Sequence, residues 1–215
     1  MPRTSPGDMK APLTRTALSR AAARLARRDA DLARVFRRHG PPPLWARPAG
    51  FATLARIILE QQVSLASAAA VYRRLRGGLG RVTSATVADA GESRLRALGV
   101  TRQKACYLVL LGQAVENGFL DVAALARMPD DDARAALQRL KGIGAWSADI
   151  YLLMALRRPD VWPAGDLALA SAAHAVKGLR RRPSPDRLER LAEPWRPYRS
   201  VAARMLWQHY LAGGE

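Results

Sequence analysis

Residues 140–149 have the sequence Leu-Lys-Gly-Ile-Gly-Ala-Trp-Ser-Ala-Asp, the most informative stretch of the chain for its fold. Its two glycines bracket one apolar residue between two segments with helical periodicity. Glycine permits a tight turn and leaves backbone N–H groups uncovered at the start of the next helix, where they and the helix dipole can hold a phosphate. A tight corner between two helices, with glycine chosen for steric reasons, explains the pattern equally well.

The charge of the chain narrows the class of partner. Its 215 residues include 35 lysines and arginines against 18 aspartates and glutamates, which gives a net charge of +17. The positive electrostatic field of such a charge favours binding to nucleic acid or to an anionic membrane surface. Only four of the cations are lysines, and arginine binds phosphate bidentately and stacks on bases. A biased genome composition is the alternative explanation of the arginine excess.

Composition excludes several other classes of protein. A hydrophobic fraction of 49% is typical of a folded chain, here with one large core or two small lobes. A single cysteine, Cys106, excludes a disulfide scaffold, a cysteine-ligated iron–sulfur cluster and a four-ligand zinc site, and we expect it in the core. The three histidines share no ligand spacing. No apolar run has the length of a signal peptide or a membrane span, so we expect a soluble cytoplasmic protein with no membrane partner.

The pattern along the chain predicts an all-α protein. Strand signals are almost absent, and helical periodicity recurs throughout. We expect a loose segment over 1–11 and a chain break at 40–43. Helices are predicted over 17–38, 51–62, 65–75, 84–90, 92–97, 101–117, 121–127, 130–140, 145–156, 167–177, 185–192 and 197–212.

Three blocks of sequence together indicate a family. They are residues 57–64, the hairpin region through Asp166, and residues 195–207. Over about residues 50–212 the chain resembles the helix-hairpin-helix, Gly/Pro-rich loop, aspartate superfamily of DNA base-excision glycosylases. Within it the chain is most similar to the 3-methyladenine DNA glycosylase II group, in a compact form without an N-terminal α/β domain. A spacing of twenty residues from Trp146 to Asp166 makes the resemblance specific.

The resemblance implies a two-lobed all-α fold with the active site in a cleft between the lobes. We expect one module over 12–215, whose middle lobe covers about 51–156 and contains the hairpin at 138–149. The N-terminal and C-terminal helices would form the second lobe.

Asp166 is the candidate catalytic residue. It follows a Pro/Gly loop and precedes a helical segment, so it is predicted at a helix N-terminus, which favours the ionised carboxylate. In the family this aspartate stabilises the oxocarbenium character that develops on the sugar when the base departs. A plain helix cap is the alternative. Asp149, the nearest rival, is better explained by solubility or by a local salt bridge.

Trp146 decides the type of reaction. Members of the superfamily that also cut the strand carry a lysine two residues after the second hairpin glycine, where a Schiff base forms. In this chain the position is Trp146. The resemblance therefore implies a monofunctional enzyme that releases the base and leaves an intact abasic site.

The base pocket is predicted from the last helix and from the family. Trp207 points away from the expected core face of its helix, so it needs a second lobe or a bound base. In the family, the positions of Trp146 and Trp207 wall the pocket, where stacking suits a cationic alkylated purine. Ile150 replaces the family's pocket tyrosine, and Trp162 could supply the missing ring or belong to the core. The core stripe expected on the last helix is Tyr198, Val201, Ala202, Met205, Leu206 and His209.

Other residues are predicted to contact DNA. The family's wedge, which fills the gap left by a flipped nucleotide, corresponds to Gln62, with Gln61 and Ser64 as backbone-contacting or helix-capping neighbours. A DNA phosphate would be bound by the hairpin backbone at Gly142, Ile143, Gly144 and Ala145. By resemblance alone, the main-chain carbonyls of Gln138, Leu140 and Ile143 would hold a monovalent cation, Na⁺ or K⁺. We expect no required cofactor and no transition metal.

These expectations combine into one function and two alternatives. The chain is predicted to be a monomeric, nucleoid-associated glycosylase of base excision repair. It would excise alkylated purines of the 3-methyladenine and 7-methylguanine type from double-stranded DNA. The first alternative is a glycosylase of the same fold for uracil, mismatched or oxidised bases. The second is a noncatalytic helix-hairpin-helix protein that binds distorted DNA.

Overall fold

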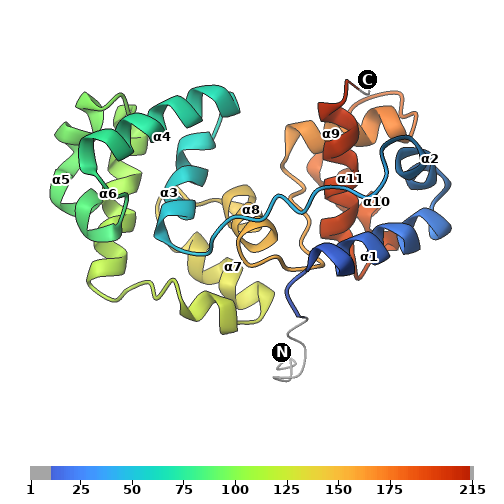
Figure 1. Ribbon diagram of the computed structural model, residues 1–215, viewed down its shortest axis with the longest axis horizontal. Helices are drawn as coiled ribbons and strands as arrows, with labels where there is room; N and C mark the ends of the chain where they lie inside the picture. The colour runs from blue at the N-terminus through green and yellow to red at the C-terminus, as the bar shows by residue number, and fades with distance from the viewer. Residues whose placement is uncertain (1–10, 214–215) are drawn as a thin grey trace. The chain divides into compact units, whose positions relative to one another are not determined.

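The computed structural model describes residues 11–213 and confirms an all-α protein. No β-strand occurs in the described part of the chain, and none of its helices is long and apolar enough to cross a membrane. Residues 1–10 of the segment expected to be loose lie outside the described residues. The helices, shown in Figure 1, are α1 (Arg15–Arg28), α2 (Ala30–His39), α3 (Phe51–Glu60), α4 (Leu65–Leu79), α5 (Ser84–Ala97), α6 (Arg102–Glu116), η2 (Ala124–Arg127), α7 (Asp130–Gln138), α8 (Ala145–Met154), α9 (Leu167–Val176), α10 (Pro185–Ala192), η3 (Glu193–Trp195) and α11 (Arg199–Leu211).

The chain divides into two compact units. Residues 47–151 form the first unit, and residues 11–46 with residues 152–213 form the second. The boundary falls inside α8, earlier than the position near residue 156 expected from the sequence. In the first unit α3 packs against α4 and α6, and α5 packs against α6. Cys106, expected in the core, is only partly buried on α6.

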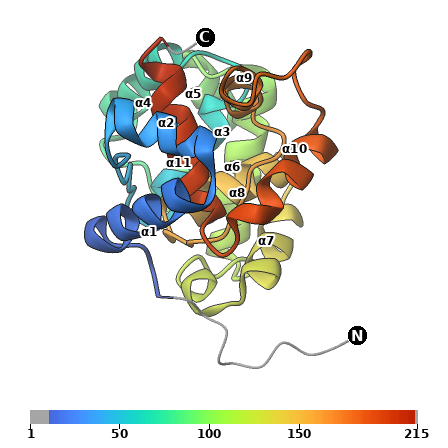
Figure 2. The ribbon, with the colours of Figure 1, turned by 90° about the vertical axis from the view of Figure 1, so that its right-hand side faces the viewer.

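Helix α11 is the centre of the second unit. Helices α1, α2 and α9 all pack against it, as two perpendicular views show (Figures 1 and 2). The predicted core-stripe members Val201, Ala202, Met205 and Leu206 are fully buried, and every other residue from Arg199 to Trp207 is buried as well. Helix α11 is thus covered on several sides, which agrees with the expectation that Trp207 needs an apolar surface of its own.

Arg204 anchors α11 to two distant segments of the second unit. Its side chain is fully buried and donates hydrogen bonds to the carbonyls of Leu44 (2.9 Å), Ser200 (2.9 Å) and Leu153 (2.7 Å). Burial lowers the pKa of Arg204 to about 10. Three carbonyls are satisfied by one planar guanidinium, which joins the segment after α2 and the end of α8 to α11.

The helix predicted over 17–38 is in fact two helices separated at Asp29. The carboxylate of Asp29 accepts hydrogen bonds from the backbone N–H groups of Asp31 and Leu32, which begins α2. It also accepts from Lys177 Nζ and Trp195 Nε1, both at 2.7 Å. Burial alone would raise the pKa of Asp29, but the bonds from Lys177, Trp195 and Leu32 lower it. The cap of α2 is local, whereas the second oxygen of the Asp29 carboxylate has partners from distant segments, which local periodicity does not reveal.

Glycines act differently in α4 and α5. Gly91 has φ +64° and interrupts α5, which agrees with the two helices predicted on either side of it. Helix α4 continues through Gly77 and Gly78 to Leu79, so the predicted end at Leu75 is wrong. A Cβ at Gly78 would collide with the Leu98 side chain. Gly78 thus permits close packing within a helix and does not end it.

Candidate active site

The hairpin between α7 and α8 uses its two glycines for different purposes. Gly142 has φ +93°, and the ring of Tyr107 occupies the place where its Cβ would be. Gly144 is exposed, and a Cβ there would meet nothing within 4 Å. The Ile143 side chain, 4% exposed, anchors the turn in the core, and its N–H donates to the Leu140 carbonyl at 3.1 Å. Gly142 is therefore a steric requirement, while Gly144 leaves open backbone at the start of α8, next to exposed Ala145.

Asp149 is a structural residue, as predicted. Arg134 Nε donates to Asp149 Oδ1 at 2.7 Å, and Asp149 is buried. Burial alone would lower the pKa of Arg134, but the hydrogen bond and the charge of Asp149 raise it, with a further contribution from Asp131. This ion pair joins α7 to α8 on either side of the hairpin.

The turn between α3 and α4, residues 61–64, contains the predicted wedge residue and is called the wedge turn; it presents Gln62 to solvent. Gln62 is exposed and has φ +55°, a left-handed conformation that is uncommon for a residue with a side chain. Ser64 begins α4, and its Oγ accepts from the Ser67 N–H at 3.1 Å. The helix-capping interpretation of Ser64 is confirmed.

The side chain of Gln61 contacts the hairpin, and its backbone fits the helix-capping alternative predicted for it. Its Nε2 donates to the Gly142 carbonyl and to Ser147 Oγ, both at 2.8 Å. Its backbone N–H caps α3 by donating to the Ile58 carbonyl at 3.4 Å. A primary amide has two N–H groups to donate, and both have partners inside the first unit.

Asp166 lies at the start of α9, as the sequence predicts. Its Oδ1 accepts the backbone N–H of Leu169 at 2.7 Å and the indole N–H of Trp207 at 3.1 Å. The preceding loop is held in place because Ser200 Oγ bonds both the N–H and the carbonyl of Val161, each at 2.9 Å. The carboxylate is only half-buried, so it is oriented by two donors and still reachable from solvent.

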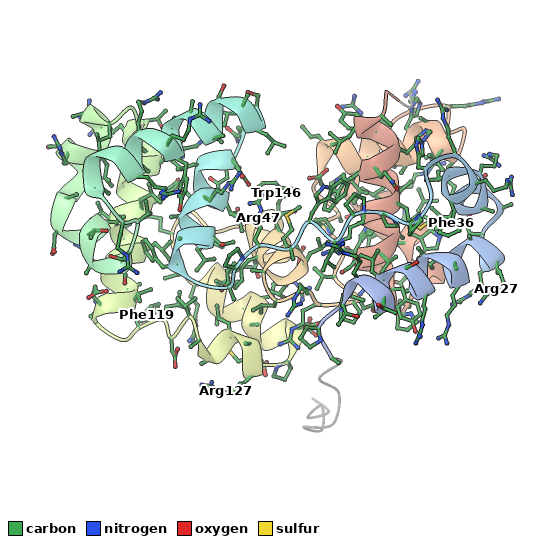
Figure 3. All side chains as sticks on the ribbon, viewed as in Figure 1. Arg27, Phe36, Arg47, Phe119, Arg127 and Trp146 are labelled. Atoms are coloured by element: carbon green, nitrogen blue, oxygen red, sulfur yellow. The ribbon has the colours of Figure 1, made fainter. Side chains whose placement is uncertain are left out.

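The four residues predicted for the base pocket lie in different surroundings. Trp207 is 7% exposed and bonds Asp166 within the second unit, so its indole N–H has a partner without a bound base. Trp162 is 4% exposed and packs edge to face on Trp195, with ring centroids 5.4 Å apart, as expected of a core residue. In the first unit, Ile150 is buried, and Trp146 lies half-buried in the first turn of α8 (Figure 3). Pocket roles for these residues remain predictions.

Comparison with known families agrees with this geometry. The family described as the HhH-GPD superfamily base excision DNA repair protein matches residues 55–197, which include the wedge turn, the hairpin and Asp166. This chain belongs to the HhH-GPD superfamily.

Individual HhH-GPD relatives extend the comparison. DNA-3-methyladenine glycosylase 2 of Escherichia coli is 30% identical over 165 residues, which are 71% of this chain and 55% of that enzyme. The chain thus spans just over half the length of that enzyme. A crystal structure of DNA-3-methyladenine glycosidase from Bacillus halodurans is similar with a TM-score of 0.77 and 28% identity, over 88% of each chain. The 3-methyladenine DNA glycosylase of Schizosaccharomyces pombe in complex with abasic DNA shares the fold, with a TM-score of 0.80 and 24% identity over 87% of this chain and 95% of that one.

Metal-binding groups are sparse in this HhH-GPD chain. Among residues 11–213 no three His, Cys, Asp or Glu side chains come together in a way that could hold a metal ion. The hairpin carbonyls offer a different kind of ligand. Gln138 is the last residue of α7, where carbonyls lack partners within the helix, and the Leu140 carbonyl accepts one N–H and keeps a second lone pair.

Two residues that support the HhH-GPD site, Lys104 and Tyr107, belong to none of the predicted motifs. Lys104 Nζ donates to the carbonyls of Leu59 and Gln61, and the Tyr107 ring packs against Gly142. Both residues lie on α6. The available signal was the rarity of lysine, since a chain that uses arginine almost everywhere has only four lysines.

Proposed function

We propose that this chain is a monofunctional DNA glycosylase that removes alkylated purines, of the 3-methyladenine and 7-methylguanine type, from double-stranded DNA. The observation that carries the proposal is the Asp166 carboxylate, held by two N–H donors at the start of α9 and half-open to solvent. Membership of the HhH-GPD superfamily and the names of the relatives support the substrate class. A net charge of +17 suits a DNA partner, and the protein would act as a monomer.

The chemistry follows from the charge that develops on the sugar. When the bond between C1′ and the base nitrogen breaks, its electron pair leaves with the base and the sugar becomes cationic. The Asp166 carboxylate stabilises that cation and accepts a proton from the attacking water, whose oxygen then bonds to C1′. An alkylated purine already carries a positive charge, so it departs as a neutral base without prior protonation.

Strand cleavage would need an amine at the reacting sugar. At the position where the lyase members of the family carry their catalytic lysine, this chain has the indole of Trp146, which forms no Schiff base. The product is therefore an abasic site in an uncut strand.

The first unit would handle the DNA backbone and the displaced base. Exposed Gly144 and Ala145 present backbone to a phosphate at the start of α8, and exposed Gln62 would enter the duplex when the nucleotide flips out. A monovalent cation on the carbonyls of Gln138, Leu140 and Ile143 would add positive charge beside that phosphate. Replacing K⁺ by tetramethylammonium at equal ionic strength should then weaken DNA binding.

The decisive experiment compares the wild type with Asp166→Asn on duplex DNA that contains 7-methylguanine. Asparagine is a good helix cap and keeps the acceptor for Leu169 and Trp207, so folding and DNA affinity should be unchanged. Loss of the negative charge should lower the single-turnover excision rate by about 10³-fold. Strand breaks should appear only after alkali treatment.

Other outcomes of this experiment select the alternatives. Excision of uracil or an oxidised purine, but not of 7-methylguanine, would show that the enzyme acts on another class of damaged base. The replacement of the family's pocket tyrosine by Ile150 would then account for the different substrate. Tight binding to distorted DNA with no excision of any base would indicate a noncatalytic protein. Breaks without alkali would contradict the monofunctional assignment.

A further inference from the structure

Helix α6 contacts both of the turns that the proposed function assigns to DNA. Lys104, in its first turn, reaches the wedge turn: its Nζ donates to the Leu59 carbonyl at 2.7 Å and to the Gln61 carbonyl at 2.8 Å. Tyr107, three residues later, lies under the hairpin with its ring where a Cβ of Gly142 would be. One helix thus supports two neighbouring turns of the first unit.

The bonds of Lys104 fall on the end of α3, where the backbone most needs a donor. The last carbonyls of a helix have no partner within it and carry the negative end of the helix dipole. A compact ammonium with three donors can bond two such carbonyls at once. Burial lowers the pKa of Lys104, and in that partly desolvated place each of its hydrogen bonds is strengthened.

Gln61 joins the two turns directly. Its carbonyl accepts from Lys104, and its side-chain amide donates to Gly142 and Ser147 of the hairpin region. The next residue, Gln62, has the left-handed φ of +55°. A residue with a side chain keeps such a conformation only when its surroundings hold it there. Lys104 and Gln61 hold one side of Gln62, and the cap of Ser64 on α4 holds the other.

We propose that Lys104 is a positioning residue for base flipping, which fixes the backbone of the wedge turn so that Gln62 projects into the duplex. With Gln61 and Tyr107 it makes the wedge turn and the hairpin one rigid element. When the hairpin binds a DNA phosphate, this contact then sets the position of Gln62 in the duplex. Lys104 itself does not touch DNA. The inference rests on the proposed function, because a wedge has a task only if the protein flips a nucleotide.

The experiment measures flipping separately from excision. The fluorescence of 2-aminopurine placed beside an abasic-site analogue rises when the stack is disrupted, and this signal requires no chemistry. We expect Lys104→Met to reduce the amplitude of this rise as much as Gln62→Ala does. It should also lower the single-turnover excision rate about tenfold. Affinity for undamaged duplex should stay within about twofold, because the phosphate contacts remain.

Two comparisons separate positioning from general damage to the fold. If Lys104 acts through Gln62, then Lys104→Met in a Gln62→Ala background changes the amplitude no further. Lys177→Met is the matched control, since it removes another partly buried, hydrogen-bonded lysine from the second unit. It should lower the midpoint of thermal unfolding and leave the 2-aminopurine amplitude unchanged. Lys104→Arg keeps a cation with several donors, so it should retain at least half of the wild-type 2-aminopurine amplitude. It replaces Lys104→Met in the comparison if the Met variant does not fold.

The outcomes distinguish this inference from the proposed function. An unchanged amplitude in Lys104→Met, or an effect that adds fully to that of Gln62→Ala, overturns the inference and leaves the glycosylase assignment standing. If the wild type excises no base but its 2-aminopurine signal still depends on Lys104, the assignment fails and the positioning role stands. A wild type that gives no 2-aminopurine signal overturns both.

Discussion

Asp166 combines two tasks in one carboxylate. Its Oδ1 caps α9 through Leu169 and accepts the indole N–H of Trp207, a residue 41 positions later in the chain. A cap alone needs only the first bond. The second bond comes from the central helix α11 and fixes the carboxylate relative to the core of the second unit. Orientation of this kind matters for catalysis because a displaced charge stabilises the transition state less well.

The contribution of the Trp207 bond can be isolated with a pair of variants. Trp207→Phe removes the donor to Asp166 and should lower the single-turnover excision rate about tenfold, the effect of losing one hydrogen bond to a charged group. Trp162→Phe is the control, because the buried indole N–H of Trp162 has no hydrogen-bond partner among the described residues. Both variants lose the same ring volume, so both should be destabilised by about 1–3 kcal/mol. Equal rates in the two variants would remove Trp207 from the catalytic arrangement.

The hairpin and the wedge turn act as one element of the first unit. Arg134 and Asp149 join α7 to α8, Gln61 links the wedge turn to Gly142, and Tyr107 packs beneath that glycine. The hairpin thus derives its shape from side chains outside itself, and Lys104 bonds the wedge turn from α6. The two hairpin glycines should consequently respond differently to substitution.

We expect Gly142→Ala to destabilise the protein by about 2–4 kcal/mol, since its Cβ would meet the Tyr107 ring and its φ is +93°. Gly144→Ala adds a Cβ in open space at ordinary φ and should change stability by less than about 1 kcal/mol. Denaturant unfolding followed by circular dichroism measures both free energies. Similar values for the two variants would contradict the packing of Tyr107 against the hairpin.

At the scale of the whole molecule, the two units supply different parts of the proposed reaction. The first carries the wedge turn and the hairpin, and the second carries Asp166 and Trp207. The net charge of +17 belongs to the molecule as a whole and acts on DNA over a distance of about one Debye length. It should dominate binding to undamaged DNA, where no base is flipped.

Binding to undamaged duplex should therefore depend steeply on salt. We expect the logarithm of the association constant to fall linearly with the logarithm of KCl concentration, with a slope steeper than about −3, as counterions are released from the phosphates. Fluorescence anisotropy of a labelled duplex between 50 and 300 mM KCl, a range of about sixfold, measures this slope. Asp166→Asn should give the same slope. A flat dependence would mean that the arginine excess reflects composition and not DNA binding.

The helical class, the hairpin, the family and the position of Asp166 at a helix start could all be predicted from the amino-acid sequence. Each of these depends on local information: periodicity, glycine and proline spacing, and motifs within about twenty residues. The cap at Asp166 was predictable because an aspartate at a helix start accepts the free N–H groups of the first turn. For Asp149 a local salt bridge was one of two alternatives, and the sequence did not name its partner Arg134 on α7.

The partners of the site residues could not be predicted from the sequence, because they depend on how distant segments pack together. Segments far apart in the chain meet in each of these contacts. They are the bond of Asp29 to Lys177, the burial of α11 on several sides, the bond of Gln61 to the hairpin, and the bond of Lys104 to the wedge turn. Periodicity reports which face of a helix is apolar but not how many neighbours cover it, and a polar side chain does not reveal which carbonyl it will meet. These contacts form because buried donors and acceptors must be satisfied by whatever the fold brings near them.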